Sequence, residues 1–279
     1  MDRIPFGVSQ LDQRVDGGMP PGSVVLLAGE AGAGAREFCY TSAVMNGLGI
    51  ADPDTFELQY GELRGEATLP EEVHYLSFTA SGEDLTEEMA FTIEEDLVAG
   101  GLEAVTFKDL SPEYFQMSPV PQEWYSGTHA TLTELGKNTE REGAVAALAT
   151  YIEEYAADNL LIVDSLTDLV GLRDDDGVNW DDVVYLLKGL RKAARDWRGA
   201  ILLLVSSDAL SDERMGNLMS SVDGTMSFEW ASGGNELSRT LIVREFRGVL
   251  SQLEEEEIVR FETEIHEAGY DITNVRKIR

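Results

Sequence analysis

Residues 22–38 read Gly22-Ser-Val-Val-Leu-Leu-Ala-Gly-Glu-Ala-Gly-Ala-Gly-Ala-Arg-Glu-Phe38. The stretch joins an apolar run (23–28) to a glycine-rich turn and to the start of a helical pattern (36–46). This order predicts a buried strand, a tight loop and a helix, which is the arrangement of a phosphate-binding loop. The alternative is that the glycines only form a tight turn between strand and helix, and the loop alone does not separate the two readings.

The loop matches the glycine positions of the frame G-x-x-x-x-G-K-[S/T] but not its last two positions. Gly29 and Gly34 occupy the two glycine positions, and Gly32 is an additional glycine between them. Ala35 stands where a lysine reaches the outer phosphates, and Arg36 stands where a hydroxyl helps to hold magnesium. Backbone amides and a helix N-terminus still favour an anion, so we expect the loop to form without its catalytic side chains.

The composition is strongly acidic, with 52 acidic residues against 21 basic ones and a formal net charge of −31 in 279 residues. Such a surface repels itself in dilute buffer, whereas molar salt shortens the screening length to roughly 3 Å and removes most of the repulsion. The balance favours a salt-loving host over an ordinary acidic cytosolic protein. It also argues against non-specific binding of nucleic acid, which needs a basic surface.

Several classes of site and location are disfavoured by the residues present. No run approaches eighteen apolar residues and residues 1–5 do not resemble a secretory signal, so we expect a cytoplasmic protein without a membrane segment. Cys39 is the single cysteine and is expected to pack in the core. His74, His129 and His266 have no metal-ligand spacing.

The segment before the loop carries a more specific signal. It contains Arg3 to Gly7 as Arg-x-x-x-Gly, then Leu11-Asp12, then residues 17–23 as Gly-Gly-Met-Pro-Pro-Gly-Ser. These features resemble the KaiC/RadA branch of the RecA-like ATPases, and they lie outside the nucleotide loop itself. The resemblance implies an α/β, RecA-like P-loop NTPase fold. Together with the acidic composition, it suggests that the protein comes from a halophilic archaeon. That fold has a central, mostly parallel sheet with helices on both faces and an antiparallel C-terminal extension.

The rest of the chain supplies the elements of that fold as a single domain over residues 1–279. Residues 49–72 and 110–136 are predicted to be inserted surface segments. Helices are expected at 81–99, 139–157 and 183–198. The parallel strands are expected at 24–28, 73–78, 104–107, 160–164 and 200–206, and the antiparallel strands at 224–229, 239–246, 258–265 and 270–274.

The strand that ends in Asp164-Ser165 resembles the Walker B strand, whose aspartate holds the magnesium shell in the family. In the family, the strand that corresponds to 73–78 ends in a pair of carboxylates, one of which activates the attacking water. In this chain Thr79-Ala80 occupies that place. Glu83, one turn further, is a weak substitute as a catalytic base. Residues 244–248 resemble a Lys-x-Arg-Gly segment that, in the family, reaches a neighbouring subunit. In this chain Glu245 replaces the lysine of that segment, whereas Arg247 keeps its arginine and is the predicted interface residue.

These changes predict a KaiC-like pseudo-ATPase, a regulatory or scaffolding module that has abandoned efficient phosphoryl transfer, with signal transduction as one setting. The alternative is a divergent but active ATPase in which Arg36 reaches the phosphates and Glu83 is the base. A DNA recombination mediator is disfavoured by the charge. The nucleotide-binding residues, if ATP binds, are Gly29, Gly32, Ala33, Gly34, Ala35, Arg36, Asp164 and Ser165.

The expected cofactors and partners follow from the same resemblance. The sequence leaves open whether ATP binds. A bound magnesium ion, which Asp164 would hold, is disfavoured. The expected partners are proteins or other copies of the chain, a ring included, and neither nucleic acid nor membrane. Because position 36 and Asp164 share a magnesium ion in the resembled family, we predict that Arg36 approaches Asp164 or Ser165 within about 4 Å. The alternatives for Arg36 are solvent, Glu37 or Glu30.

Overall fold

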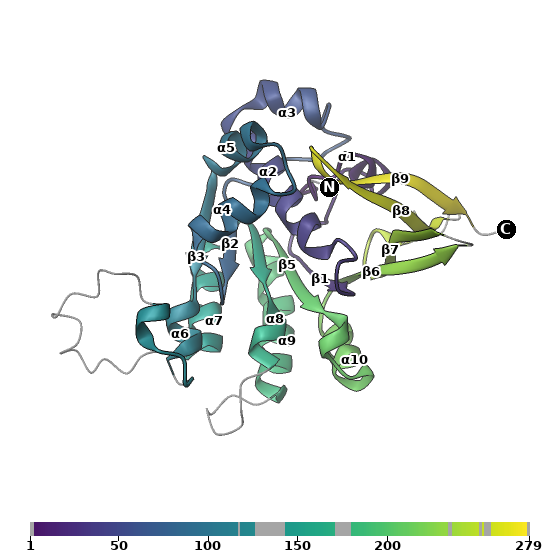
Figure 1. Ribbon diagram of the computed structural model, residues 1–279. Coiled ribbons are helices and arrows are strands. Elements are labelled where there is room, and N and C mark those ends of the chain that lie inside the picture. The colour runs from purple at the N-terminus through teal and green to yellow at the C-terminus, as the bar shows by residue number, and fades with distance from the viewer. Residues whose placement is uncertain are drawn as a thin grey trace.

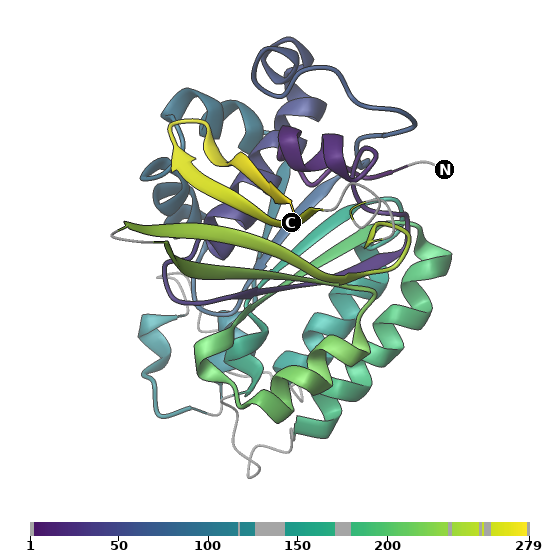
Figure 2. The same ribbon diagram turned by 90° about the vertical axis from the view of Figure 1, so that its right-hand side faces the viewer.

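A nine-stranded sheet organises the computed structural model, which describes residues 3–116, 118–125, 143–170, 180–233, 236–250, 253 and 258–277 (Figures 1 and 2). The strands are β1 (Ser23–Gly29), β2 (Val73–Ser77), β3 (Val105–Asp109), β4 (Leu160–Asp164), β5 (Ala200–Ser206), β6 (Gly224–Gly233), β7 (Glu236–Phe246), β8 (Ile258–His266) and β9 (Gly269–Lys277). Their order is β3-β2-β4-β5-β1-β6-β7-β8-β9.

The strands from β3 to β6 in this order pair in parallel, and β6 to β9 pair antiparallel. This confirms the predicted parallel sheet with an antiparallel extension, and β4 lies inside the sheet between β2 and β5. Every residue of β1 and of β4 is buried. Their unbroken apolar runs fit strands that are covered on both faces.

Helices cover both faces of the sheet, as predicted (Figure 2). One apolar core lies under α1 (Ser9–Arg14), α2 (Ala35–Ala51), α3 (Pro53–Gln59), α4 (Gly82–Ala90) and α5 (Glu95–Leu102). The other lies under α7 (Ala144–Tyr155), α8 (Leu166–Val170), α9 (Trp180–Trp197) and α10 (Asp212–Ser221). The β8–β9 hairpin bends over α2, where the Tyr270 amide donates to Thr41 Oγ1 at 2.8 Å.

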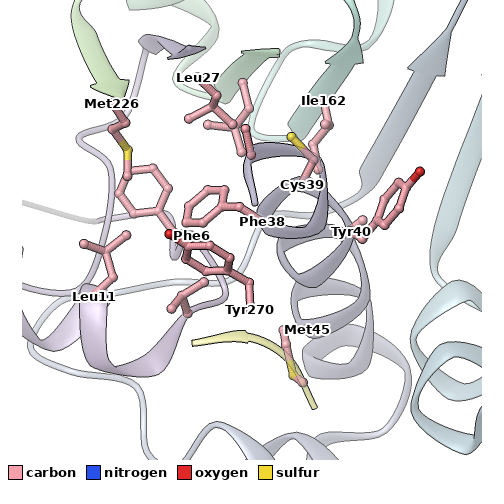
Figure 3. Close-up of a cluster of buried hydrophobic side chains, with 14 of the residues drawn as sticks. Phe6, Leu11, Leu27, Phe38, Cys39, Tyr40, Met45, Ile162, Met226 and Tyr270 are labelled. Carbon is pink, nitrogen blue, oxygen red and sulfur yellow. The ribbon is translucent and has the colours of Figure 1, made fainter. Parts of the chain in front are cut away.

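The first core places α2 directly behind the glycine loop. Phe38 of α2 is fully buried, and its ring contacts the rings of Phe6, Phe228 and Tyr270 at centroid distances of 5.8, 5.3 and 5.4 Å. Figure 3 shows Phe38 between Phe6 and Tyr270, with Cys39 on the next position of the helix. The burial of Cys39 confirms its predicted place in the core.

The predicted helix over 81–99 is wrong because the chain forms two helices there. Ser81 caps α4 as expected, because its Oγ accepts from the Asp84 amide while its own amide donates to the Asp84 carboxylate. The break between α4 and α5 contains Ile93, which is buried and pairs with Ala268 of the β8–β9 turn. The Glu94 amide, which a continuous helix would direct to the Ala90 carbonyl, instead donates to the Glu267 carbonyl at 2.7 Å.

The predicted surface segment 49–72 is largely exposed but contains helical structure that its sequence pattern does not indicate. The helix α2 continues to Ala51, and α3 follows with Asp52 as its N-cap. Phe56 and Tyr60 are buried and their rings stack at 4.7 Å. In the second predicted segment, 110–136, the structure shows α6 (Ser111–Phe115) and a 3-10 turn, Gln122–Trp124, while 126–136 lie outside the described residues.

A buried carboxylate ties the N-terminal segment to the end of α3. Asp12 accepts hydrogen bonds from the amides of Phe6 and Gly7 and from the Tyr60 hydroxyl, at 2.9, 3.0 and 2.9 Å. Burial raises the pKa of Asp12 to about 7 from 3.8, and these hydrogen bonds oppose the rise only in part. The Leu11-Asp12 motif therefore has a structural role as an anchor for residues 3–7.

Replacing Asp12 with asparagine is expected to change how stability depends on pH. Native Asp12 keeps its proton up to a pKa of about 7, whereas the unfolded chain releases it near 3.8, so the native state binds more protons between these values. Stability from this group is therefore present at low pH and lost as the pH rises through 7. We expect urea unfolding to show that the free energy of unfolding of wild type, relative to that of Asp12→Asn, rises by up to about 1.4 kcal/mol per pH unit as the pH falls from 7. A difference between the two proteins that stays constant with pH would contradict the assignment.

Candidate functional site

The glycine loop joins β1 to α2 with the predicted geometry. Gly32 and Gly34 have φ angles of 72° and 102°, which a residue with a Cβ rarely adopts. A Cβ on Gly34 would also approach the Tyr270 ring at 2.8 Å. The loop therefore needs glycine at both positions for its backbone conformation, and at Gly34 for space as well.

A pocket of about 410 Å³ opens beside the loop, at the carboxyl end of the parallel strands. In open parallel sheets this edge is the usual place for a ligand. Its lining comes from the loop, from the start of α2, from residues that follow β2 and β4, and from the last residues of β5. The lining residues are Gly29, Glu30, Ala31, Gly32, Gly34, Ala35, Arg36, Glu37, Thr79, Ser165, Thr167, Asp168, Leu204, Val205 and Ser206.

The predicted contact between Arg36 and Asp164 is present. One terminal nitrogen of Arg36 donates to Asp164 Oδ1 at 3.1 Å. The second carboxylate oxygen, Oδ2, accepts from the Tyr75 hydroxyl at 2.9 Å. The Asp164 side chain is 5% exposed and that of Arg36 is 53% exposed. Both oxygens of the Asp164 carboxylate thus accept hydrogen bonds from the protein.

The charges of this pair stabilise one another. Burial raises the pKa of Asp164, while the Arg36 charge and the Tyr75 hydrogen bond oppose the rise. For Arg36, burial is the largest single influence and lowers the pKa, but the Asp164 carboxylate together with Tyr40 and Tyr75 more than offsets it, so the pKa is raised overall. The guanidinium is therefore charged at every pH at which the protein folds.

These residues do not fit a magnesium ion in the way that the resembled family holds one. The position that would supply a hydroxyl carries a guanidinium, and the Asp164 oxygens already accept from Arg36 and Tyr75. Within the described residues, no group of three His, Cys, Asp or Glu side chains could hold a metal ion.

Three side chains from distant parts of the sequence hold the loop from outside the pocket. Trp230 Nε1 donates to the Ala31 carbonyl at 3.0 Å, and the Trp230 amide donates to the Glu30 carboxylate at 2.8 Å. Arg239 Nε donates to the Gly32 carbonyl at 3.0 Å, and its guanidinium lies 4.7 Å from the centre of the Trp230 ring. Sequence reasoning missed both residues because no local motif marks them.

The third of these side chains is an acidic one. Asp208 lies in the 3-10 turn Ser207–Ala209 directly after β5, and its Oδ2 accepts from the Ala31 amide at 2.8 Å. Ser206, the last residue of β5, lines the pocket, and its amide donates to Thr167 Oγ1. The end of β5 thus reaches the pocket wall, and the turn after it reaches the loop.

The structure brings most, but not all, predicted site residues together. Ser165 lines the pocket, and its hydroxyl donates to Asp168 at 2.9 Å. Ala33 is fully buried behind the loop. Glu83 is exposed in the first turn of α4 and is not part of the pocket lining. A catalytic role for Glu83 is therefore not supported by its position.

Arg247, predicted as an interface residue, makes an ion pair within its own chain. Its terminal nitrogen donates to Asp223 Oδ1 at 2.6 Å, and Arg191 Nε donates to the same oxygen at 3.1 Å. Asp223 is buried at the base of β6 and also accepts from the Val24 amide at 3.3 Å. This pairing gives Arg247 a structural role, and its contact with a neighbouring subunit stays a prediction.

Comparison with known proteins gives structural but not sequence matches. No protein-family model and no curated protein matches the chain. In the part of the chain that the structure describes, none of the helices is both long and apolar enough to span a bilayer.

Two of the solved structures that match are similar to this chain along almost their whole length. A KaiC-like protein from the hyperthermophilic archaeon Pyrococcus horikoshii OT3 has a TM-score of 0.61 at 16% identity, with 98% of this chain and 99% of that chain covered. The flagellar accessory protein FlaH from Methanocaldococcus jannaschii has a TM-score of 0.56 at 17% identity, with 96% of each chain covered. The chain therefore has the RecA-like fold of the KaiC-like protein and FlaH, as the sequence resemblance implied.

Proposed function

We propose that this protein is a KaiC-like pseudo-ATPase, a regulatory or scaffolding module that keeps the nucleotide-loop fold without efficient phosphoryl transfer. The observation that carries the proposal is the Arg36–Asp164 pair at 3.1 Å. It supports a guanidinium as a permanent replacement for the metal ion on which the resembled family relies.

Phosphoryl transfer depends mainly on positioning and on the stabilisation of developing negative charge. Three groups that supply these functions in the resembled family are replaced around one pocket. At the start of α2, Ala35 replaces the lysine and Arg36 replaces the metal-binding hydroxyl, and after β2 Thr79 replaces the water-activating carboxylate. A single loss can be compensated by a neighbour. Three losses around the same pocket support the loss of catalysis.

The charge of the pocket points in the same direction. Its lining contains the carboxylates of Glu30, Glu37 and Asp168, while its one cation, Arg36, is neutralised by Asp164. A triphosphate approaching this pocket meets net negative charge at short range. The pocket is thus poorly suited to hold ATP tightly in dilute buffer.

The second candidate is a divergent but active ATPase, and one observation favours it. The Arg36 side chain is about half exposed and lines the pocket, so its remaining donors are accessible to a phosphate. In that case Asp164→Asn would abolish turnover, because it removes the carboxylate that orients Arg36.

Release of inorganic phosphate from ATP, measured in molar potassium chloride with and without magnesium, tests the proposal. We expect a rate far below about 1 per second, the lower end of ordinary enzyme turnover. We also expect no difference between wild type and Asp164→Asn. Enzyme-like turnover that Asp164→Asn removes would establish the active ATPase instead.

A module of this kind acts through contacts with partner proteins or with its own copies. The ring assembly expected from the resemblance remains part of the proposal. Because Glu245 replaces a lysine in the interface segment and Arg247 is paired with Asp223, such contacts would not clamp a neighbour's phosphates in the family's manner. Light scattering in molar salt, with and without nucleotide, distinguishes a monomer from a ring.

A further inference from the structure

We propose that Asp208 is an autoinhibitory latch on the glycine loop. Its carboxylate holds the Ala31 amide and places a negative charge beside the mouth of the pocket, so that the site resists anionic ligands until salt weakens the repulsion. This inference rests on the proposed function in taking the pocket as the site of a phosphorylated ligand.

The contact itself is short and comes from outside the loop. Asp208 Oδ2 lies 2.8 Å from the Ala31 nitrogen, and Ala31 is part of the pocket lining. Amide groups of such loops are the donors that bind anions. One donor of this loop is therefore already satisfied by an anionic group of the protein.

The latch is able to open without disturbing the core. Asp208 is exposed and lies in a three-residue turn after β5. The loop has independent support on its other side, because Trp230 binds the Ala31 carbonyl and Arg239 binds the Gly32 carbonyl. Removing the Asp208 carboxylate should free the Ala31 amide while the loop keeps its shape.

The latch adds to an unfavourable field for anions. Glu30, Glu37 and Asp168 line the pocket, and the charge of Arg36 is balanced by Asp164. The screening length is about 10 Å at 0.1 M salt and about 3 Å at 1 M. Anion binding to this pocket should therefore strengthen with salt, whereas binding to an ordinary basic site weakens.

The test compares wild type, Asp208→Ala and Glu57→Ala by calorimetric titration with ATP in EDTA. Glu57 is an exposed residue of α3, so its replacement changes the net charge of the chain by the same amount. At about 0.1 M potassium chloride, Asp208→Ala should bind ATP about tenfold more tightly than the other two proteins. At about 1 M potassium chloride the difference in ATP affinity between Asp208→Ala and wild type should become smaller, because the wild type gains affinity. Hydrogen exchange at the Ala31 amide should be faster only in Asp208→Ala.

Three results would overturn the latch: equal affinities for wild type and Asp208→Ala at low salt, an equal gain in Glu57→Ala, or no detectable ATP binding by Asp208→Ala at either salt concentration. Unchanged exchange at Ala31 would overturn the contact itself. The proposed function fails by a different measurement, the release of phosphate by the wild type, so the failures of the two proposals are distinguishable.

Discussion

Replacing Phe38 with alanine is expected to lower the free energy of unfolding by about 3–5 kcal/mol. The ring is fully buried and contacts three aromatic rings, those of Phe6, Phe228 and Tyr270. These neighbours come from the N-terminal segment, β6 and β9, so they belong to separate elements and cannot close over the cavity together. Urea unfolding in molar potassium chloride measures the loss.

The matched control is Phe91→Ala. This phenylalanine is 88% exposed after the end of α4 and buries little apolar surface. Its replacement should change the unfolding free energy by no more than about 0.5 kcal/mol. If the two alanine variants were equally stable, the aromatic cluster in Figure 3 would not be the support of α2 that the structure shows.

The parts of the fold that the sequence predicts are those in which one local pattern decides the structure. The apolar runs at 23–28 and 160–164 are long enough to be buried strands, and each ends in residues with a chemical signal. Because the carboxyl ends of parallel strands share one edge of the sheet, the sequence alone predicts that Arg36 and Asp164 lie close together. Their contact at 3.1 Å is a consequence of that topology.

The parts that sequence reasoning misses depend on contacts between distant residues. The break after α4 exists because Ile93 pairs with Ala268, and no pattern within 81–99 shows it. Trp230, Arg239 and Asp208 bind loop residues that lie 177 to 207 positions away in the sequence. Their types are ordinary for strands and turns, so only the folded chain identifies them as parts of the site.

Restoring the two missing loop residues together, by Ala35→Lys and Arg36→Thr, should produce magnesium-dependent nucleotide binding. Ala35 and Arg36 both line the pocket, so the new side chains point to the same space. The change removes the guanidinium from Asp164 Oδ1 and supplies the hydroxyl and the ammonium group that the phosphate-loop frame requires. ATP should bind this variant at least about tenfold more tightly with magnesium than without it, while wild type shows no such ratio.

The control that separates charge from metal chemistry is Arg36→Lys, which keeps a cation beside Asp164 but adds no hydroxyl. It should bind ATP equally with and without magnesium, because an ammonium group at position 36 still competes with a divalent ion for the buried carboxylate. Circular dichroism establishes that each variant is folded before titration. A folded double variant whose ATP affinity ignores magnesium would mean that residues 35 and 36 do not limit metal binding. The cause would then lie with the Tyr75 hydroxyl, which holds the other oxygen of Asp164 and remains in every variant.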